Sequence, residues 1–355
     1  MGRGTCMGNK ICIATDFHLA FSAQFDRCGI NGISGRLQEI LDSIKWAAEV
    51  GKQKKCTHFF GLGDIFDKAE RLPTKEGLEI QNTFKYINTL YKGKCGLLTG
   101  NHDKVSDTVS ILDLFKDSIP IINEVYWLDV DGARLFFVPY LREPEDFYKA
   151  IEDIQKNLDC PGKKYLFGHF WDTSVMGVDP EAIDLTKFDV RFFSRVFCGH
   201  YHVPTNDLTN LVVYLGTLLN KKFSETGPKG CWILDTEKNK LEFIPNPHSP
   251  EFFSVEDVVI LGAPETVERN AYYRVYCNAD SVMDVSRLLS ACKGFEILPK
   301  KDASGIVSNI SIDAVDKKNN QTLKEYVLAN CAIFVPDGIE VTEFRTRGSE
   351  LLVDL

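Results

Sequence analysis

The chain has 355 residues, of which 44% are hydrophobic and 26% are charged, and its formal net charge is −9. This composition is typical of a globular protein, and the length predicts two domains or one large domain with an appendage. The acidic balance argues against a protein that binds DNA through charge alone. Bound metals and a local basic groove would still permit an enzyme that acts on nucleic acid.

The cysteines and the absence of targeting patterns indicate an intracellular protein. All 11 cysteines are scattered singly and no Cys-x-x-Cys pair occurs, which disfavours a disulfide framework or a zinc ribbon. No stretch approaches the roughly 18 apolar residues that span a bilayer, and the Gly-rich first ten residues lack a signal-peptide pattern. We therefore expect a cytoplasmic protein, of a bacterium or a phage-infected host, with mostly buried thiols and no membrane contact.

The first hundred residues alternate between short apolar strands and amphipathic helices. We expect strands at 11–15, 57–62 and 94–99, and helices at 33–50 and 73–91. Each of the three strands ends in a polar cluster. The alternation predicts an α/β fold, in which functional groups gather at the carboxyl ends of the strands.

The middle of the chain is richer in strands. The pattern predicts a helix at 144–157, strands at 126–130, 135–138, 165–167 and 190–198, and a closing β meander at 211–215, 230–235 and 240–245. Three prolines, Pro245, Pro247 and Pro250, then interrupt the chain. We place a domain boundary there, so that residues 10–250 form the first domain after a flexible extension at 1–9.

The remaining residues differ in charge and pattern from the first domain. Residues 251–355 carry a net charge of −6, compared with −3 for the first 250 residues, and they contain no histidine. We expect strands at 272–277, 295–299 and 305–312, and helices at 282–291 and 322–330. This pattern predicts a smaller α+β domain over 251–335, followed by a C-terminal tail over 336–355.

Five short polar clusters follow the apolar strands and contain five of the seven histidines. They are Asp16-Phe17-His18, Gly63-Asp64-Ile65-Phe66-Asp67, Gly100-Asn101-His102-Asp103, Gly168-His169 and Gly199-His200-Tyr201-His202. Carboxylate, imidazole and amide donors together favour Mn²⁺, Fe²⁺ or Zn²⁺ over Mg²⁺, which prefers oxygen ligands. Two such ions would clamp a phosphate, with Asp64 the best bridging candidate and His102 a candidate proton donor.

Single members of this set carry little weight, because a lone buried histidine is usually structural. The five clusters in one order, all at strand ends, are the informative observation. Asp67 is interpreted as a residue that orients a metal ligand, with a helix-start carboxylate as the alternative. His58 is expected to be a structural residue inside a strand, and His248 a surface residue in the proline-rich segment.

The ordered motifs DxH, GDxxD, GNHD, GH and GHxH resemble those of the calcineurin-like metallophosphoesterase superfamily over roughly residues 11–203. The resemblance implies a four-layer α-β-β-α sandwich with a smaller C-terminal capping domain. It implies a first metal held by Asp16, His18, Asp64 and His202, and a second held by Asp64, Asn101, His169 and His200. His102 would be the catalytic acid, aligned by Asp103.

The residues after the last motif narrow the resemblance. Tyr214-Leu215-Gly216-Thr217, Phe223-Ser224-Glu225 and Lys229-Gly230 are similar in order to the SbcD nuclease family, and the overall length resembles its phage version. Lys68-Ala69 after the second motif and Asp103 in the third disfavour a Ser/Thr protein phosphatase, which has Arg-Gly and Glu there.

The SbcD resemblance implies a two-metal, Mn²⁺-dependent DNA nuclease, with Fe²⁺, Zn²⁺ and Mg²⁺ as alternative ions. The family degrades duplex ends 3′→5′, cuts single strands, and acts in recombination and repair with an SbcC-type coiled-coil ABC ATPase. It also forms homodimers through a helix that corresponds to residues 73–91, where Leu78, Phe84, Ile87 and Leu90 would be available for packing. The sequence indicates no DNA-contacting residues.

Two other functions remain open from the sequence. The same metal site would serve a phosphodiesterase or phosphatase that acts on a small nucleotide or a nucleotide–lipid. Alternatively, the chain would mainly be a scaffold that positions a partner ATPase, although an intact ligand set argues against a purely structural role.

Overall fold

The computed structural model describes residues 10–20, 32–68, 72–158, 161–173, 180–205, 209–225 and 227–300. The chain divides into two compact units, Met1–Pro250 and Glu251–Leu355. The expected extension at 1–9, the strand at 305–312, the helix at 322–330 and the tail at 336–355 lie outside the described residues.

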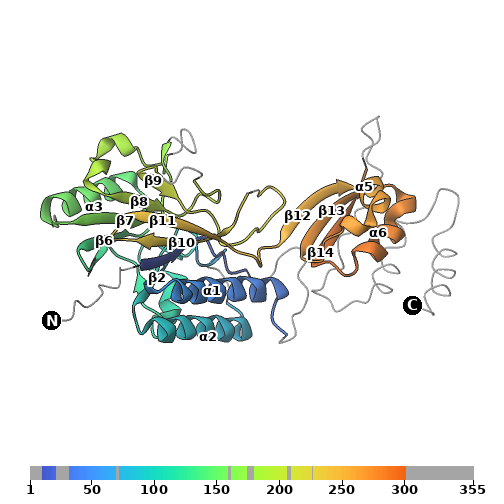
Figure 1. Cartoon of the computed structure of the whole chain (residues 1–355), viewed down its shortest axis with the longest axis horizontal. Coiled ribbons are helices and arrows are strands. Elements are labelled where there is room, and N and C mark those ends of the chain that lie inside the picture. The colour runs from blue at the N-terminus through green and yellow to red at the C-terminus, as the bar shows by residue number, and fades with distance from the viewer. Residues whose placement is uncertain are drawn as a thin grey trace. The chain divides into compact units, whose positions relative to one another are not determined.

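A six-stranded mixed sheet forms the centre of the first unit, with the order β11-β10-β1-β2-β3-β4 (Figure 1). Strands β1 to β4 run parallel, whereas β10 is antiparallel to both β1 and β11. Their bounds are Lys10–Ala14 for β1, Cys56–Leu62 for β2, Cys95–Leu98 for β3, Ile121–Ile122 for β4, Gly230–Asp235 for β10 and Lys240–Pro245 for β11.

A second sheet of five strands has the order β5-β6-β7-β8-β9. Strands β6 to β9 are parallel and β5 is antiparallel at the edge. Their bounds are Tyr126–Val130 for β5, Ala133–Val138 for β6, Lys163–Gly168 for β7, Arg195–Cys198 for β8 and Val212–Tyr214 for β9. Buried side chains from both sheets form one core, in which the rings of Phe137 and Phe167 stack at 5.1 Å.

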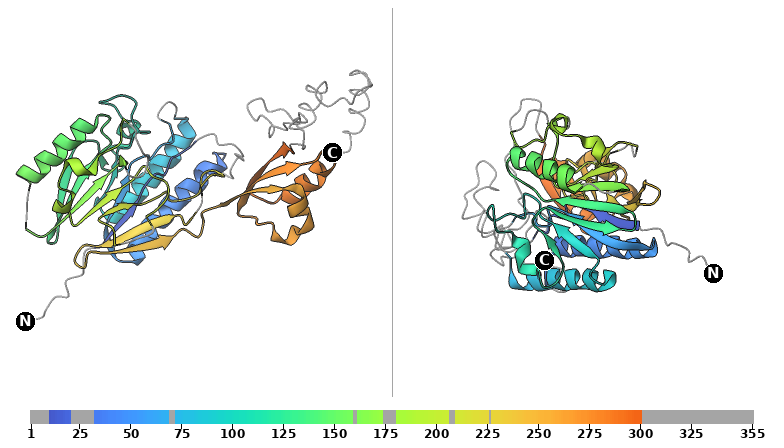
Figure 2. Two further views of the ribbon diagram at one scale, coloured as in Figure 1. Left: turned by 90° about the horizontal axis from the view of Figure 1, so that it is seen from above. Right: turned by 90° about the vertical axis from the view of Figure 1, so that its left-hand side faces the viewer.

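Helices cover the outer faces of the two sheets. Helices α1 (Gly35–Gln53) and α2 (Thr74–Tyr91) lie outside the first sheet, and α3 (Pro144–Asn157) lies outside the second (Figure 2, right). The side chain of Ser34 begins α1 by accepting the backbone N–H of Leu37, and Pro144 occupies the first turn of α3. The result is a four-layer α-β-β-α sandwich, which confirms the predicted α/β fold.

The closing β meander is a wrong prediction. Strand β9 completes the second sheet beside β8, whereas β10 and β11 form a hairpin that joins the first sheet beside β1. The strand expected over 190–198 is also shorter: a 3₁₀ turn at Val190–Phe192 precedes β8, because Asp189 caps that turn by accepting the backbone N–H of Arg191. Further 3₁₀ turns lie at Ile111–Phe115 and Leu185–Lys187.

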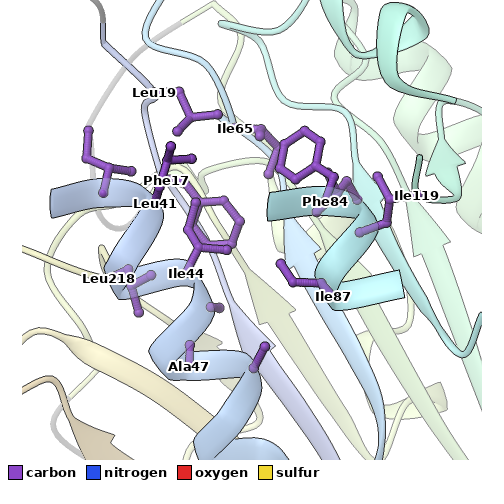
Figure 3. Packing of buried hydrophobic residues seen from close by; sticks show 14 of the residues in the cluster. Phe17, Leu19, Leu41, Ile44, Ala47, Ile65, Phe84, Ile87, Ile119 and Leu218 are labelled. Carbon is purple, nitrogen blue, oxygen red and sulfur yellow. The ribbon is translucent and has the colours of Figure 1, made fainter. Parts of the chain in front are cut away.

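Three of the four α2 side chains expected to pack at a dimer contact pack inside this unit instead. Phe84 and Ile87 are fully buried, and they lie beside Ile65 and Ile119 in the core between the helices and the first sheet (Figure 3). The reason is the helical period, which turns these positions toward the sheet. Leu90 is partly buried and packs against the same core, whereas Leu78 is 55% exposed.

The described part of the second unit is a three-stranded parallel sheet of β12 (Glu251–Glu256), β13 (Ala271–Cys277) and β14 (Gly294–Pro299). The short helix α5 (Asp257–Gly262) and a 3₁₀ turn at Pro264–Thr266 connect the first two strands. A 3₁₀ turn at Ala279–Ser281 and α6 (Val282–Leu289) connect the second and third. Val275, Val285 and Leu289 lie in its apolar core.

The described cysteines are free and buried, as expected for structural thiols. Burial raises the pKa of Cys56 and Cys95 to about 12, so neither thiol ionises at neutral pH. Among the helices that the structure describes, none is long and apolar enough to cross a membrane.

Candidate metal centre

The five polar clusters meet at the carboxyl ends of parallel strands from both sheets. The loop after β1 is joined to the loop after β2 by backbone hydrogen bonds from Asp16 to Gly63 (3.1 Å) and from His18 to Asp64 (2.9 Å). Gly63 has φ +82°, and a Cβ on it would lie 2.2 Å from Nδ1 of His169. Glycine is therefore required there for the close approach of the two sheets' loops.

A first set of donors consists of Asp16, His18 and His202, whose ligand atoms lie within 4.8 Å of one another. Oδ1 of Asp16 lies 3.7 Å from Nε2 of His18 and 3.8 Å from Nε2 of His202. Oδ2 of Asp64 lies 3.6 Å from Nε2 of His18. These separations leave room for an ion between the donors.

A second set consists of Asp64, His169 and His200. Oδ1 of Asp64 lies 3.1 Å from Nε2 of His169, and Oδ1 of Asn101 lies 3.0 Å from both Nε2 of His169 and Nδ1 of His200. Asp64 thus directs one carboxylate oxygen to each donor set. This is the arrangement of a carboxylate that can bridge two ions.

The chemistry of these donors fits divalent metals. His18 is 4% exposed, and both of its ring nitrogens are buried without a hydrogen-bond partner. A buried imidazole nitrogen that makes no hydrogen bond is costly in a folded protein, whereas a metal at Nε2 would satisfy that nitrogen. Its Nδ1 lies 3.4 Å from Oδ1 of Asp67, a placement that fits the interpretation of Asp67 as a residue that orients a ligand.

The carboxylates of both sets are ionised at neutral pH. Burial would raise the pKa of Asp16, but His18 and His169 outweigh it and lower the pKa to about 2. Burial likewise opposes ionisation of Asp64, yet His169 and His18 hold its pKa well below the usual range. The site therefore presents anionic ligands, which favours cation binding.

Backbone carbonyls orient two of the histidine rings. Nδ1 of His169 donates to the carbonyl of Leu62 at 2.8 Å, so Nε2, which faces Asp64 and Asn101, is the nitrogen that would bind a metal. Nδ1 of His102 contacts the carbonyl of Asp67 at 2.6 Å, and its Nε2 lies 3.9 Å from Oδ2 of Asp64. His102 is more exposed than the ligand candidates, since 41% of its side chain is accessible.

The carboxylate of Asp103, which was expected to align His102, makes its hydrogen bonds to backbone groups in this structure. Its Oδ2 accepts the backbone N–H groups of Ile65 (3.2 Å) and Gly100 (2.9 Å), and its Oδ1 accepts that of Phe66 (2.8 Å). The Asp103 carboxylate therefore joins the loops after β2 and β3. Burial and the nearby Asp64 raise the pKa of Asp103 to about 6, although the three N–H donors oppose this shift.

Other charged and aromatic side chains at the site were not assigned a role from the sequence. Glu225 accepts from Nδ1 of His202 at 2.9 Å, and Lys229 lies 3.5 Å from Glu225. Trp171 stacks on His200 with 3.9 Å between ring centroids. Burial lowers the pKa of Lys221 to about 8 against the opposing effect of Asp16 and other carboxylates.

In the sequence, only the closeness of these residues to the predicted motifs could have indicated that they lie at the site. Trp171 stands two positions after His169, and Glu225 and Lys229 belong to the motifs that follow GHxH. His58 lies outside the site: it is 7% exposed in β2 and stacks on Phe60, as expected for a structural histidine. His248 also lies outside the site and packs edge-on against Trp46.

The fold and the paired donor sets together are those of a metallophosphoesterase. A family model described as calcineurin-like phosphoesterase matches residues 9–204. The chain therefore belongs to the calcineurin-like phosphoesterase family and is a phosphodiester hydrolase. When two metals are bound in such a site, they supply Lewis acidity and an activated water for attack on phosphorus.

Three curated relatives extend this similarity beyond the family domain. The chain is 29% identical over 269 residues to "Probable exonuclease subunit 1" of Escherichia phage T5, covering 74% of this chain and 76% of that protein. It is 28% identical over 250 residues to "Exonuclease subunit 1" of Enterobacteria phage T4, covering 67% and 68%. It is 24% identical over 215 residues to the SbcD component of the nuclease SbcCD of Staphylococcus epidermidis, covering 50% and 55%.

Proposed function

We propose that this protein is the Mn²⁺-dependent nuclease subunit of an SbcCD-type complex that processes DNA ends in recombination, repair and replication. Asp16, His18, Asp64 and His202 would bind one ion, and Asp64, Asn101, His169 and His200 the other. The observation that carries the proposal is Asp64, whose two carboxylate oxygens face the two donor sets. The three relatives are named as subunits of nucleases, which supports a nucleic acid as the substrate.

His102 is the proposed general acid. Its ring is partly exposed, and the Asp67 carbonyl contacts Nδ1, so that Nε2 faces the donor sets. A proton held at Nε2 would be delivered to the oxygen that leaves when the phosphodiester bond breaks. Asp67 would orient His18 through the 3.4 Å contact with its Nδ1.

The partners and location are also proposals. The relatives' names describe subunits, which supports an assembly with a coiled-coil ATPase of the SbcC type. A homodimer through α2 would use its solvent-facing side, where Leu78 and Tyr86 are exposed, rather than Phe84 and Ile87. The residues from 251 onward would form the capping domain, and the free, buried thiols support a reducing cytoplasm.

The test compares substrates and metals on the full chain. Labelled blunt duplex, hairpin and circular single-stranded DNA would be incubated with Mn²⁺, Mg²⁺ or Zn²⁺, beside bis-p-nitrophenyl phosphate and a cyclic nucleotide. We expect Mn²⁺-dependent shortening of the duplex from its 3′ ends and cutting of single strands. Chelator should abolish both activities.

Two variants control this experiment. Asp64→Asn should lose DNA cleavage, because it removes the anionic group that faces both donor sets. Glu242→Gln should cleave normally, since Glu242 pairs with Lys54 in a different part of the unit. Retained cleavage by Asp64→Asn would contradict the metal assignment, and hydrolysis of the small diesters without any DNA cleavage would favour a small-molecule phosphodiesterase.

A further inference from the structure

Glu225 and Lys229 form a buried ion pair directly behind His202. Oε1 of Glu225 accepts from Nδ1 of His202 at 2.9 Å, while Nε2 of the same ring lies 3.8 Å from Oδ1 of Asp16. The two nitrogens of His202 therefore face different groups: one faces a carboxylate behind it, and the other faces the first donor set. The relatives' names and the family match assign no role to Glu225 or Lys229.

The second oxygen of Glu225 is also held in place. Oε2 accepts the backbone N–H of Lys221 at 3.0 Å and lies 3.5 Å from Nζ of Lys229. Nζ of Lys229 donates to the carbonyl of His202 at 3.0 Å. Lys229 thus contacts both the carboxylate and the backbone of the histidine that the carboxylate orients.

The pair is buried next to the first sheet. Glu225 is 9% exposed and Lys229 is 3% exposed. Lys229 immediately precedes β10, and its carbonyl accepts the backbone N–H of Asn246 at 2.7 Å. A buried carboxylate is costly unless a cation and hydrogen bonds compensate it, and Lys229 with the Lys221 N–H supplies both.

We propose that Glu225 is a positioning residue that fixes the tautomer and orientation of His202 for metal binding, and that Lys229 holds Glu225 in place. Carboxylate oxygens hydrogen-bonded to metal-binding histidines keep the proton on the distal nitrogen and raise the basicity of the ligating one. His169 receives its orientation from the Leu62 carbonyl instead. His202 is therefore a ligand candidate that a side-chain carboxylate holds by a direct hydrogen bond, and its affinity for metal should depend on that carboxylate.

The inference rests on the proposed two-metal function, and its test measures Mn²⁺ binding rather than cleavage. Isothermal titration calorimetry at one pH would compare the full-length wild type with Glu225→Gln. We expect affinity for one of the two Mn²⁺ ions to fall by about 10- to 100-fold and affinity for the other to remain unchanged. Glu242→Gln, which breaks a surface Glu–Lys pair, should match the wild type.

A double variant separates positioning from a general structural role. If Glu225 acts through His202, Glu225→Gln combined with His202→Ala should bind Mn²⁺ no more weakly than His202→Ala alone. Losses that add in the double variant would overturn the proposal. Unchanged Mn²⁺ affinities in Glu225→Gln would also overturn it.

Lys229→Met provides a second route if Glu225→Gln does not fold. It leaves Glu225 in place but removes its cation, and we expect a smaller loss of affinity confined to the same Mn²⁺ ion. Wild-type affinities in this variant would count against the role of Lys229. A wild type that binds two Mn²⁺ ions but leaves DNA intact would refute the proposed function and leave this inference standing.

Discussion

The role of Asp103 in joining two loops predicts a stability defect in Asp103→Asn. The carboxylate is fully buried and accepts three backbone N–H groups, from Ile65, Phe66 and Gly100. Asparagine has the same shape but only one acceptor oxygen. If that oxygen takes the place of Oδ2, the amide NH₂ faces the N–H of Phe66, and that one N–H loses its acceptor. If the oxygen takes the place of Oδ1 instead, the N–H groups of Ile65 and Gly100 both lose their acceptor.

The better orientation therefore loses one buried hydrogen bond and places two donors together. An unsatisfied buried donor costs about 1–3 kcal/mol, so we expect a loss of about 2 kcal/mol in the free energy of unfolding. For a unit of this size, that corresponds to a decrease of about 4–8 °C in Tm. The loops that carry Asp64 and Asn101 should loosen as well.

Thermal unfolding of the metal-free protein at pH 8 measures this loss. Because the pKa of Asp103 is raised to about 6, its charge is disfavoured in the folded protein at pH 8, so the measured loss is the hydrogen-bond loss reduced by this charge penalty. Asp113→Asn is the matched control, because Asp113 accepts a single backbone N–H, from Ser110, which an asparagine oxygen can also accept. Its Tm should change little. If Asp103→Asn lowered kcat but left Tm at the wild-type value, Asp103 would act on His102 and the reasoning from its hydrogen bonds would be wrong.

Two further predictions concern histidines. His102→Ala should bind both Mn²⁺ ions in calorimetry but cleave end-labelled duplex DNA about 10²- to 10⁴-fold more slowly; loss of an ion would contradict its role as acid. Burial, Lys94 and Lys52 lower the pKa of His58 from 6.5 to about 4, so its contribution to stability is complete above pH 6.5 and is lost as the pH falls toward 4. When the pH falls from 7 to 5, the free energy of unfolding of the metal-free protein, measured in urea, should therefore decrease by about 1–2 kcal/mol less in His58→Gln than in the wild type. Equal decreases in the two proteins would contradict this.

The gathering of the donor residues was predictable because it depends on local patterns. Asp16, Asp64 and Asn101 each follow a short apolar strand, and parallel strands in one sheet bring such ends to one edge. The sequence does not show which sheet each strand joins. The β10–β11 hairpin pairs with β1 in the first sheet and does not add to β9 in the second. This pairing depends on strand register and on which faces are buried, and both are properties of the packed sheets.

Roles that depend on loop conformation were not predictable. Asp103 adjoins His102 in the chain, which suggests an interaction between them, yet its carboxylate turns toward the N–H groups of another loop. Glu225 is 23 positions from His202 and reaches it only through the return of the chain to β10. Phe84 is a large apolar residue of the kind found at protein interfaces, and only the packed structure shows that it is buried in the core.

The backbone of the site explains why such supporting contacts matter. Asp16, His18, Asp64 and His200 all have positive φ, between 46° and 75°, a conformation that costs about 1–3 kcal/mol for each non-glycine residue. Hydrogen bonds to the surrounding loops, including those that Asp103 accepts, must offset this cost in the folded chain. Because these loops are already ordered by the protein's own contacts, metal binding would not have to supply the free energy of arranging them.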